Sequence, residues 1–314
     1  MASSTSAFLP EPVDSGVAWL FPGQGSQQAG MGRDVWERSA AARRVFEAAD
    51  RVMGFPLSAL CFEGPDEKLR ETEFAQPAIL ATSLACLAAA LERGDVAARP
   101  AFTAGHSLGE YTALIAAGAL SLEEGLGLLR ERARLMAEAS RAERGTLAAI
   151  IGLDEAAVRA ICREASADVC NLNLPAQTVI GGTLAAVARA SDLARQRGAQ
   201  RVQELNVSGA FHSRLMQPAV EGLKRAIAAV RVSAPEVPVV ANATAQPLTT
   251  EEAVREELGV QIVSPVRWHD SVTLMAAAGV TTFIEFGPGR VLTGLARRLV
   301  AEAKLVNVSG WQPA

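Results

Sequence analysis

The chain has 314 residues, which corresponds to about two domains, or to one large domain that carries an insertion. Hydrophobic residues make up 49% of it and charged residues 20%, a balance typical of a globular protein with a sizeable core. The 30 basic and 34 acidic residues leave a net charge of −4, so no basic excess indicates binding to nucleic acid. The 4 cysteines lack the CxxC spacing of zinc and redox sites, and we expect them to be reduced, buried thiols.

We expect residues 1–16 to form a loose, flexible extension of a cytoplasmic protein. They carry neither the basic stretch nor the apolar stretch of a secretory signal peptide. The longest apolar stretch of the chain, 79–91, is shorter than the about 20 residues that a membrane-spanning helix needs. The sequence therefore favours neither secretion nor insertion into a membrane.

Apolar runs and helical patterns alternate in the first third of the chain. A short apolar run at 17–21 ends in Pro-Gly and predicts a buried strand, and helical patterns follow at about 32–52 and 76–91. A second strand is predicted at about 101–104, with a helix from about Leu108. Strands that alternate with helices indicate an α/β fold with a parallel sheet.

The middle of the chain has a different order of elements. The predicted elements are a strand at 146–153, a helix at 154–165, strands at 169–174 and 178–182, a helix at 183–198 and a strand at 202–207. Asp154 is a typical N-cap residue for the first of these helices, and the second starts at Thr183. The order β-α-β-β-α-β is that of a ferredoxin-like unit. We therefore expect a small ferredoxin-like subdomain at 145–208, inserted into a larger α/β subdomain formed by 17–144 and 209–314.

The segment Gly105-His106-Ser107-Leu108-Gly109 places a G-x-S-x-G pattern between a predicted strand and a predicted helix. Two glycines permit a sharp strand-to-helix turn that exposes the serine hydroxyl, as in a nucleophile elbow. The amides at the start of the helix would face the same point, where an oxyanion develops. The pattern makes Ser107 a candidate nucleophile; the alternative is a plain helix start bounded by glycines.

A serine nucleophile needs a general base, and the chain has 3 histidines: His106, His212 and His269. The side chain of His106 should diverge from that of Ser107, its neighbour at a sharp turn. His212 follows the last strand of the inserted unit, and a junction between subdomains is a natural place for a cleft. An unperturbed histidine pKa of about 6.5 suits a base near neutral pH. We predict His212 as the base, oriented by a backbone carbonyl because no acidic residue stands out; the alternative is a structural histidine.

Arg132 is the most informative charged residue of the chain. Ser121 and Glu124 form a capping-box pattern, so a helix should begin near Leu122. Helical periodicity then places Arg132 within an apolar arc of that helix. A guanidinium on a buried face cannot lose its proton and needs an anion. The sequence leaves two interpretations of Arg132 open. It is a structural residue, as part of an internal ion pair or as a snorkelling arm, or it is a clamp for a substrate carboxylate.

Six motifs occur in one order along the chain. They are FPGQGSQ at 21–27, GHSLGEY at 105–111, RERARLM at 130–136, GAFHS at 209–213, SPVRW at 264–268 and FGPGRVLTGL at 286–295. Together they resemble the malonyl-CoA:acyl carrier protein transacylase family, which includes fatty-acid synthase transacylases and free-standing acyltransferases that serve polyketide synthases. The resemblance covers about residues 17–300, and the joint pattern is far more specific than any single motif.

The resemblance implies a role for each matching residue. Ser107 would be the acylated nucleophile and His212 its base. Arg132 would bind the free carboxylate of a malonyl group in a bidentate clamp. The backbone amides of Gln24 and Leu108 would form the oxyanion hole.

Further features follow from the same resemblance. The main-chain carbonyl of Gln261 would orient the histidine, and Phe211 matches the residue that malonyl-type members carry before it. Asn173-Leu174-Pro175 departs from the family's commoner Asn-Ser-Pro, a change that bears on carrier or acyl preference rather than on the chemistry. The family fold is a hydrolase-like α/β core with a parallel sheet and an inserted ferredoxin-like subdomain, in agreement with the pattern of elements above.

The implied activity is transfer of a malonyl group from coenzyme A to the phosphopantetheine thiol of an acyl carrier protein, through an acyl-serine intermediate, in fatty acid or polyketide biosynthesis. We expect a monomer that binds malonyl-CoA as a substrate and an acyl carrier protein as its partner, with no metal or redox cofactor. Alternatives are a proofreading acyl-thioester hydrolase, a transferase for another acyl unit, and a non-catalytic module that docks the carrier. Arg132 argues against the hydrolase, because uncharged acyl chains need no guanidinium.

Overall fold

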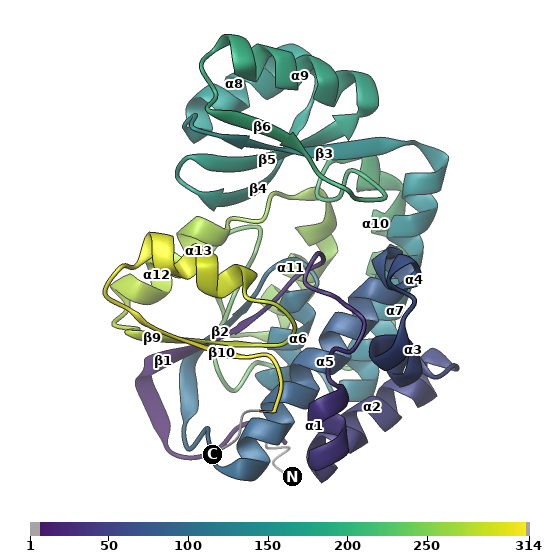
Figure 1. The fold of residues 1–314 in the computed structure, drawn as a ribbon, viewed down its shortest axis with the longest axis vertical. Helices are drawn as coiled ribbons and strands as arrows, with labels where there is room; N and C mark the ends of the chain where they lie inside the picture. The colour runs from purple at the N-terminus through teal and green to yellow at the C-terminus, as the bar shows by residue number, and fades with distance from the viewer. Residues whose placement is uncertain (1–6, 312–314) are drawn as a thin grey trace.

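The computed structural model describes residues 7–311 and places them in two sheets with helices packed around them (Figure 1). The larger sheet has the strand order β10-β9-β1-β2-β7-β8. Its strands are β1 (Val13–Phe21), β2 (Arg99–Gly105), β7 (Val239–Val240), β8 (Pro247–Leu248), β9 (Thr282–Phe286) and β10 (Lys304–Val308). Neighbouring strands run parallel except for β7 and β8. The α/β class with a parallel sheet, predicted from the alternation of elements, is confirmed.

Helices cover both faces of this sheet. They are α1 (Arg33–Arg38), α2 (Ala40–Met53), α3 (Leu57–Glu63), α4 (Asp66–Arg70), α5 (Thr72–Arg93), α6 (Gly109–Ala116), α7 (Leu122–Ala142), α10 (Gln217–Ala229), α11 (Glu251–Val260), α12 (Trp268–Ala277) and α13 (Val291–Leu299), with the short 3-10 turns η1 (Arg214–Met216) and η2 (Gln261–Val263). Trp19 and Phe21 of β1 join the core that contains α5, whereas Ala18 and Leu20 join the core that contains α12. Both faces of the strand are buried, which explains its continuous apolar run.

The helix α5 is the central helix of the larger core. By length and composition it could cross a membrane, but 89% of its most apolar window is buried inside the protein. It contacts α2, α7 and the sheet. The apolar character of this segment therefore matches that of a helix buried on all sides.

The smaller sheet has the strand order β4-β5-β3-β6, and its neighbouring strands are antiparallel. Its elements in chain order are β3 (Gly145–Ile151), α8 (Glu155–Ala165), β4 (Asp168–Leu174), β5 (Gln177–Thr183), α9 (Leu184–Gln196) and β6 (Arg201–Glu204). This is the predicted order of elements. The side chain of Asp154 caps α8 as expected, and that of Thr183 caps α9. Both helices cover the outer face of the sheet, at the top of Figure 1.

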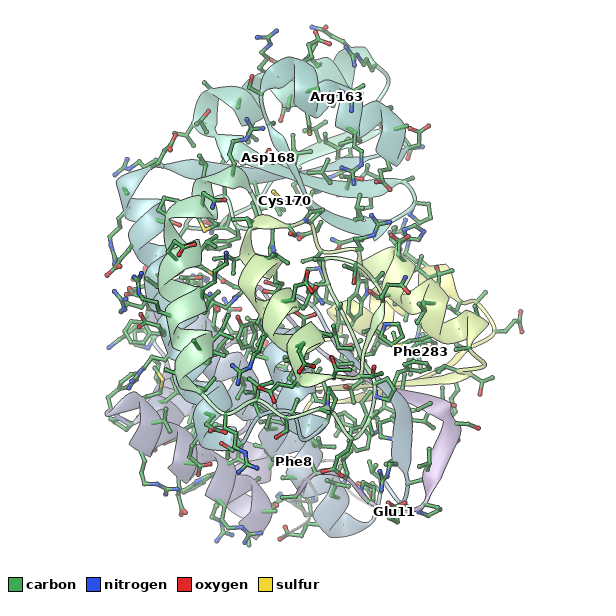
Figure 2. All side chains as sticks on the ribbon, turned by 180° about the vertical axis from the view of Figure 1, so that it is seen from behind. Phe8, Glu11, Arg163, Asp168, Cys170 and Phe283 are labelled. Atoms are coloured by element: carbon green, nitrogen blue, oxygen red, sulfur yellow. The ribbon has the colours of Figure 1, made fainter. Side chains whose placement is uncertain are left out.

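Backbone hydrogen bonds join the smaller sheet to the segment that precedes α12. Val266, in the segment before α12, accepts a hydrogen bond from Leu172 N–H at 2.8 Å and donates one to the carbonyl of Cys170 at 2.8 Å. The ion pair between Arg214 of η1 and Asp168 of β4, at 2.6 Å, adds a second connection. Figure 2 shows Asp168 and Cys170 where the small sheet meets the rest of the molecule. The strands of the smaller sheet are therefore bonded to the region that follows them in the chain.

The N-terminal boundary of the first strand differs from the prediction. β1 begins at Val13 rather than Val17, because Val13 and Asp14 already pair with β2. Their side chains are exposed, so the apolar pattern gave no sign of them. The expectation of a loose extension is wrong for 13–16, and Phe8 and Leu9 are buried as well. Residues 1–6 lie outside the described residues.

Two internal boundaries also differ. Ser39 divides the helix predicted at 32–52, because its backbone is extended (φ −117°, ψ 125°) and its hydroxyl caps α2 by accepting from Ala42 N–H at 3.0 Å. The strand predicted at 202–207 ends at Glu204. Neither boundary changes the order of elements, and the limits predicted for the two subdomains stay predictions.

Candidate active site

Ser107 occupies the sharp turn between β2 and α6. Its φ of 55° lies in the left-handed region, which a residue with a side chain rarely adopts. A Cβ on Gly105 would lie 1.9 Å from the carbonyl carbon of Gly109, and one on Gly109 would lie 2.2 Å from the carbonyl oxygen of Phe21. Both positions therefore require glycine, and the turn has the tight geometry of a nucleophile elbow.

Asn242, just after β7, holds this turn in place. Its Oδ1 accepts a hydrogen bond from Ser107 N–H at 2.7 Å, and its Nδ2 donates to the carbonyl of Gly105 at 2.7 Å. The residue is 1% exposed. One buried side chain thus satisfies the N–H of the strained residue and the carbonyl two positions before it, which is how such strain persists in a folded protein.

The imidazole of His212 contacts the serine hydroxyl directly. The distance between His212 Nε2 and Ser107 Oγ is 2.7 Å. On the opposite side of the ring, Nδ1 lies 2.9 Å from the carbonyl oxygen of Gln261 and 3.1 Å from that of Ser264. Carbonyl oxygens only accept, so the proton of the ring is on Nδ1. Nε2 is left as the acceptor for the proton of Ser107.

The surroundings of His212 keep this ring neutral. Burial, and after it the positive charge of Arg132, lower the pKa of His212 from 6.5 to about 3. The ring is therefore unprotonated at neutral pH and has a free lone pair toward Ser107. The arrangement is that of a neutral base poised to accept a proton.

The other two histidines lie away from the hydroxyl. His106 Nε2 is 3.0 Å from Asn173 Oδ1, and its ring packs near that of Trp268, with centroids 5.6 Å apart. His269 Nδ1 is 3.1 Å from its neighbour Asp270. The side chain of His106 diverges from Ser107 as predicted, and it contacts the small sheet through the Asn-Leu-Pro segment.

Arg132 reaches the same point from α7. This helix begins at Leu122 with the predicted capping box of Ser121 and Glu124. Arg132 is 1% exposed, so its predicted place in the apolar arc is confirmed. It is among the largest fully buried side chains of the described residues.

The hydrogen-bond partners of the Arg132 guanidinium are neutral groups. Its terminal nitrogens donate to Gln76 Oε1 at 2.5 Å, to Gln261 Oε1 at 3.0 Å and to Ser107 Oγ at 3.2 Å. Its carbon lies 5.4 Å from the centre of the Tyr111 ring, and its Nε has no partner. Burial lowers its pKa, yet a guanidinium stays protonated in proteins.

This environment decides between the readings that the sequence left open for Arg132. Within residues 7–311 the guanidinium forms no ion pair with a carboxylate, and it does not extend to solvent. A buried cation without an anionic partner beside Ser107 has the charge and the free donor to bind an anion there.

Two backbone amides at the elbow are free to donate. The loop that carries Gln24 packs tightly on the elbow: a Cβ on Gly23 would lie 2.7 Å from the carbonyl oxygen of His106. In the described part of the chain, neither Gln24 N–H nor Leu108 N–H donates to a protein acceptor. These donors have no competing partner and are therefore available to an oxyanion. Their role as an oxyanion hole stays a prediction.

Phe211 precedes His212 and is 6% exposed, within the larger core. Its ring approaches the position of a Cβ on Gly209 to 3.3 Å. The proposed influence of Phe211 on acyl preference stays a prediction.

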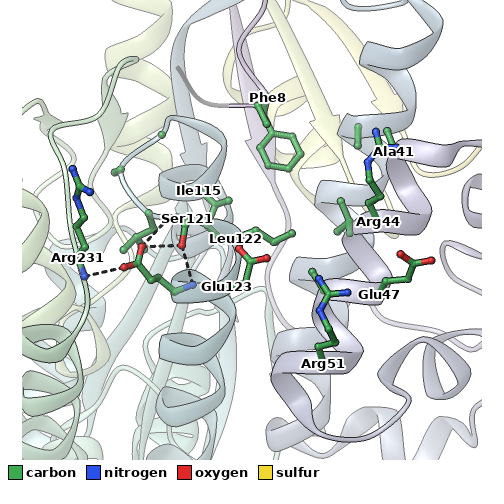
Figure 3. Close-up of a pocket in the computed structure, with 18 of the residues that line it drawn as sticks. Phe8, Ala41, Arg44, Glu47, Arg51, Ile115, Ser121, Leu122, Glu123 and Arg231 are labelled. Carbon is green, nitrogen blue, oxygen red and sulfur yellow. Dashed lines mark hydrogen bonds between the residues drawn. The ribbon is translucent and has the colours of Figure 1, made fainter. Parts of the chain in front are cut away.

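A separate cavity of about 940 Å³ lies between α2 and the start of α7 (Figure 3). Arg44, Glu47 and Arg51 of α2 line it, together with Phe8 and Ser121. None of the predicted site residues lines this cavity. In residues 7–311 no cluster of three or more His, Cys, Asp or Glu side chains could hold a metal ion.

Sequence analysis missed four residues that contact the site: Gln76, Glu110, Asn242 and Ser264. Gln76 is a buried polar residue in an otherwise apolar helix, a signal that could have drawn attention to it. Glu110 stands within the GHSLGEY motif itself, where a buried helix start makes a carboxylate unusual. Asn242 lies in a loop with no local pattern, and nothing in the sequence indicated it.

Comparison with known proteins agrees with this arrangement. The family model of the acyl transferase domain matches residues 18–312. The chain belongs to the acyl transferase domain family. This acyl transferase is 45% identical over 300 residues to the malonyl CoA-acyl carrier protein transacylase of Bacillus subtilis, with 94% of each chain covered.

Solved structures share the fold of this acyl transferase. The acyl carrier protein S-malonyltransferase of Vibrio cholerae superposes with a TM-score of 0.91 at 40% identity, over 94% of this chain and 97% of that one. A malonyl-transacylase solved in complex with a type II polyketide synthase acyl carrier protein superposes with a TM-score of 0.90 at 38% identity, over 94% and 96% of the two chains.

Proposed function

We propose that the protein transfers a malonyl group from malonyl-CoA to the phosphopantetheine thiol of an acyl carrier protein, in fatty acid or polyketide biosynthesis. The observation that carries the proposal is the buried guanidinium of Arg132, which lies 3.2 Å from the Ser107 hydroxyl without a carboxylate partner. A malonyl thioester contains both the carbonyl carbon that Ser107 attacks and a carboxylate, the anionic partner that the Arg132 guanidinium lacks. The names of the relatives support the same activity.

The first half of the reaction loads the enzyme. His212 Nε2 takes the proton of Ser107 as Oγ attacks the thioester carbonyl, and the resulting oxyanion is bound by the amides of Gln24 and Leu108. The carbon–sulfur bond then breaks, and the proton on His212 passes to the departing coenzyme A thiolate. The product is a malonyl ester of Ser107.

The second half repeats these steps with another thiol. The phosphopantetheine thiol gives its proton to His212 and attacks the ester, and the proton returns to Ser107 as the ester bond breaks. Gln261 holds the ring through its main-chain carbonyl in both halves, and Arg132 holds the malonyl carboxylate. These steps use side chains and amides alone, and we propose no metal or redox cofactor.

The proposal extends to the architecture. The order and antiparallel pairing of the small sheet support a ferredoxin-like subdomain at 145–208, inserted into a hydrolase-like core of 17–144 and 209–314. The acyl carrier protein is the proposed partner, in line with the complex of a similar transacylase. A cytoplasmic monomer that contacts neither membrane nor nucleic acid remains our expectation.

The decisive experiment is incubation of the protein with labelled malonyl-CoA, with and without holo acyl carrier protein. We expect a stable label on the enzyme in the absence of the carrier and label on the carrier in its presence. Release of free malonate in both reactions, with no label on the carrier, would instead support the thioester hydrolase. A preference for another acyl-CoA in competition would support a transferase for a different acyl unit.

A further inference from the structure

Two acidic side chains lie buried beneath the elbow and take no part in the proposed reaction. Glu110 of α6 is 0% exposed and Glu257 of α11 is 3% exposed. Their carboxyl groups lie side by side, because they accept hydrogen bonds from two consecutive backbone amides, those of Asn242 and Ala243, at 2.8 Å each. Two adjacent buried carboxylates cannot both be ionised at low cost, because their charges repel and water does not solvate them.

The carboxyl of Glu110 is bonded to the parts that build the site. Its Oε1 accepts from Asn242 N–H at 2.8 Å, and its Oε2 accepts from Gln261 Nε2 at 2.5 Å. The same amide of Gln261 accepts from Arg132 at 3.0 Å and donates to the carbonyl of Ser107 at 2.9 Å. One side chain, Gln261, therefore connects the acidic pair to the guanidinium and to the nucleophile.

The charges around the pair favour a single ionised carboxyl. Burial raises the pKa of both groups, and the charge of Glu257 raises the pKa of Glu110 further. Glu257 also accepts a hydrogen bond from Ala243 N–H at 2.8 Å, which favours a negative charge on it. The groups that face the pair are Arg132 of α7, Tyr111 of α6 and Glu256 of α11; Arg132 supplies the positive charge.

We propose that Glu110 and Glu257 hold one proton between them and carry one negative charge, which compensates the Arg132 guanidinium through Gln261 and keeps it directed at Ser107 when no substrate carboxylate is bound. The two acids are positioning residues, since they act through Gln261 and touch neither substrate nor the reacting atoms. The inference rests on the proposed function in one respect: Arg132 is taken to receive the malonyl carboxylate.

Infrared spectroscopy of the intact protein at pH 7 tests the shared proton without any substrate. We expect the wild type to show the C=O stretching band of a buried, protonated carboxyl group, shifted in D2O. Glu110→Gln and Glu257→Gln should each lack this band, because the remaining carboxylate accepts from the new amide. Both replacements preserve shape and leave one negative charge in the pair, so the fold should be retained.

Glu131→Gln is the matched control, since this acid of α7 forms an accessible ion pair with Arg134. It should keep the band of the wild type. Absence of the band from the wild type, or its persistence in both variants of the pair, overturns the proposal. This readout does not depend on activity, so it separates a failure here from a failure of the proposed function.

A second measurement tests the effect of the charge on the substrate. The negative charge of the pair opposes a carboxylate that binds Arg132. Removing it in the Glu110→Gln/Glu257→Gln protein should raise the ratio of kcat/KM for malonyl-CoA over acetyl-CoA by about 3- to 30-fold. The single variant Glu257→Gln keeps the charge and should change the ratio less. An unchanged or lower ratio in a folded double variant contradicts the proposed compensation; a merely structural role would slow both substrates alike.

Discussion

The Nε2 atom of His212 lies 2.7 Å from the hydroxyl of Ser107, although 105 positions separate the two residues in the chain. Both have a backbone in the left-handed region, with φ of 62° for His212 and 55° for Ser107. Such a conformation costs of order 1–3 kcal/mol at a residue with a side chain. The fold therefore maintains two strained residues so that one short contact forms between them.

The replacement Ser107→Ala should abolish the covalent malonyl adduct, because it removes the atom that is acylated. Intact-protein mass spectrometry after incubation with malonyl-CoA measures the adduct directly. Ser213→Ala is a suitable control, since that hydroxyl donates to the carbonyl of Ala210 and not to the site. A stoichiometric adduct on the Ser107→Ala protein would show that another residue is the nucleophile.

The replacement His212→Ala should lower the rate of acylation by about 10²- to 10⁴-fold, the usual contribution of a general base. Stopped-flow or rapid-quench measurement of adduct formation gives this rate. His106→Ala and His269→Ala should not match the loss, since their rings bond to Asn173 and Asp270 instead. If a folded His269→Ala protein were inactive, the assignment of the base would be wrong.

Acid should weaken the folded protein through His212. The pKa of this ring is about 3 in the folded state against 6.5 without its surroundings. Between these values the unfolded chain binds a proton that the folded one does not, so stability present above pH 6.5 is lost as the pH falls. From pH 6.5 to pH 5 the loss amounts to about 2 kcal/mol.

Urea unfolding at pH 7 and pH 5 checks this linkage. The wild type should lose about 2 kcal/mol more between the two pH values than His212→Gln, which cannot be protonated. His269→Gln serves as the control, because its ring is partly exposed. Equal pH dependence of wild type and His212→Gln would mean that the ring titrates normally in the folded state.

The replacement Arg132→Ala should lower the preference for malonyl-CoA over acetyl-CoA. A charge-assisted pair with the malonyl carboxylate is worth roughly 1.5–3 kcal/mol, or about 10- to 150-fold in relative rate. Transfer of malonyl should therefore slow strongly while transfer of acetyl changes little or improves. The quantity to measure is the ratio of kcat/KM for malonyl-CoA over acetyl-CoA.

Arg132→Lys provides the matched comparison, since it keeps the charge and loses the planar fork. It should recover only part of the preference. The melting temperature of each variant must be compared with that of the wild type, because Arg132→Ala leaves a cavity in a buried region. The same ratio in wild type and in a folded Arg132→Ala protein would remove Arg132 from substrate selection.

The features that the sequence predicts well are those that depend on residues close together in the chain. The caps at Ser121 and Asp154 each depend on residues three positions apart, and both are present in the structure. The break at Ser39 could not be predicted, because the apolar periodicity of α1 and α2 continues across it. The exposed start of β1 is defined by pairing with β2, and a single strand's sequence does not reveal its partner.

The residues of the site divide in the same way, into those with a local signal in the sequence and those without one. The glycines around Ser107 and the helical position of Arg132 are local signals, and their geometry follows from short-range rules. The contacts of Gln76 and Asn242 join segments separated by 56 and 135 positions, and no pattern within either segment specifies them. Motif resemblance supplied Gln261, but only its main-chain carbonyl; the three hydrogen bonds of its side chain appeared with the structure.

The backbone pairing of Val266 with β4 limits how this enzyme could be recombined with its relatives. Ser264, whose carbonyl accepts from His212, stands just before Val266 on the same short segment. A chimaera that imports residues 145–208 from another acyl transferase must present an N–H and a carbonyl in the register of Leu172 and Cys170, or the segment that orients the imidazole loses its anchor. The orientation of the His212 imidazole thus depends on the backbone of β4 as well as on the segment that contacts the ring.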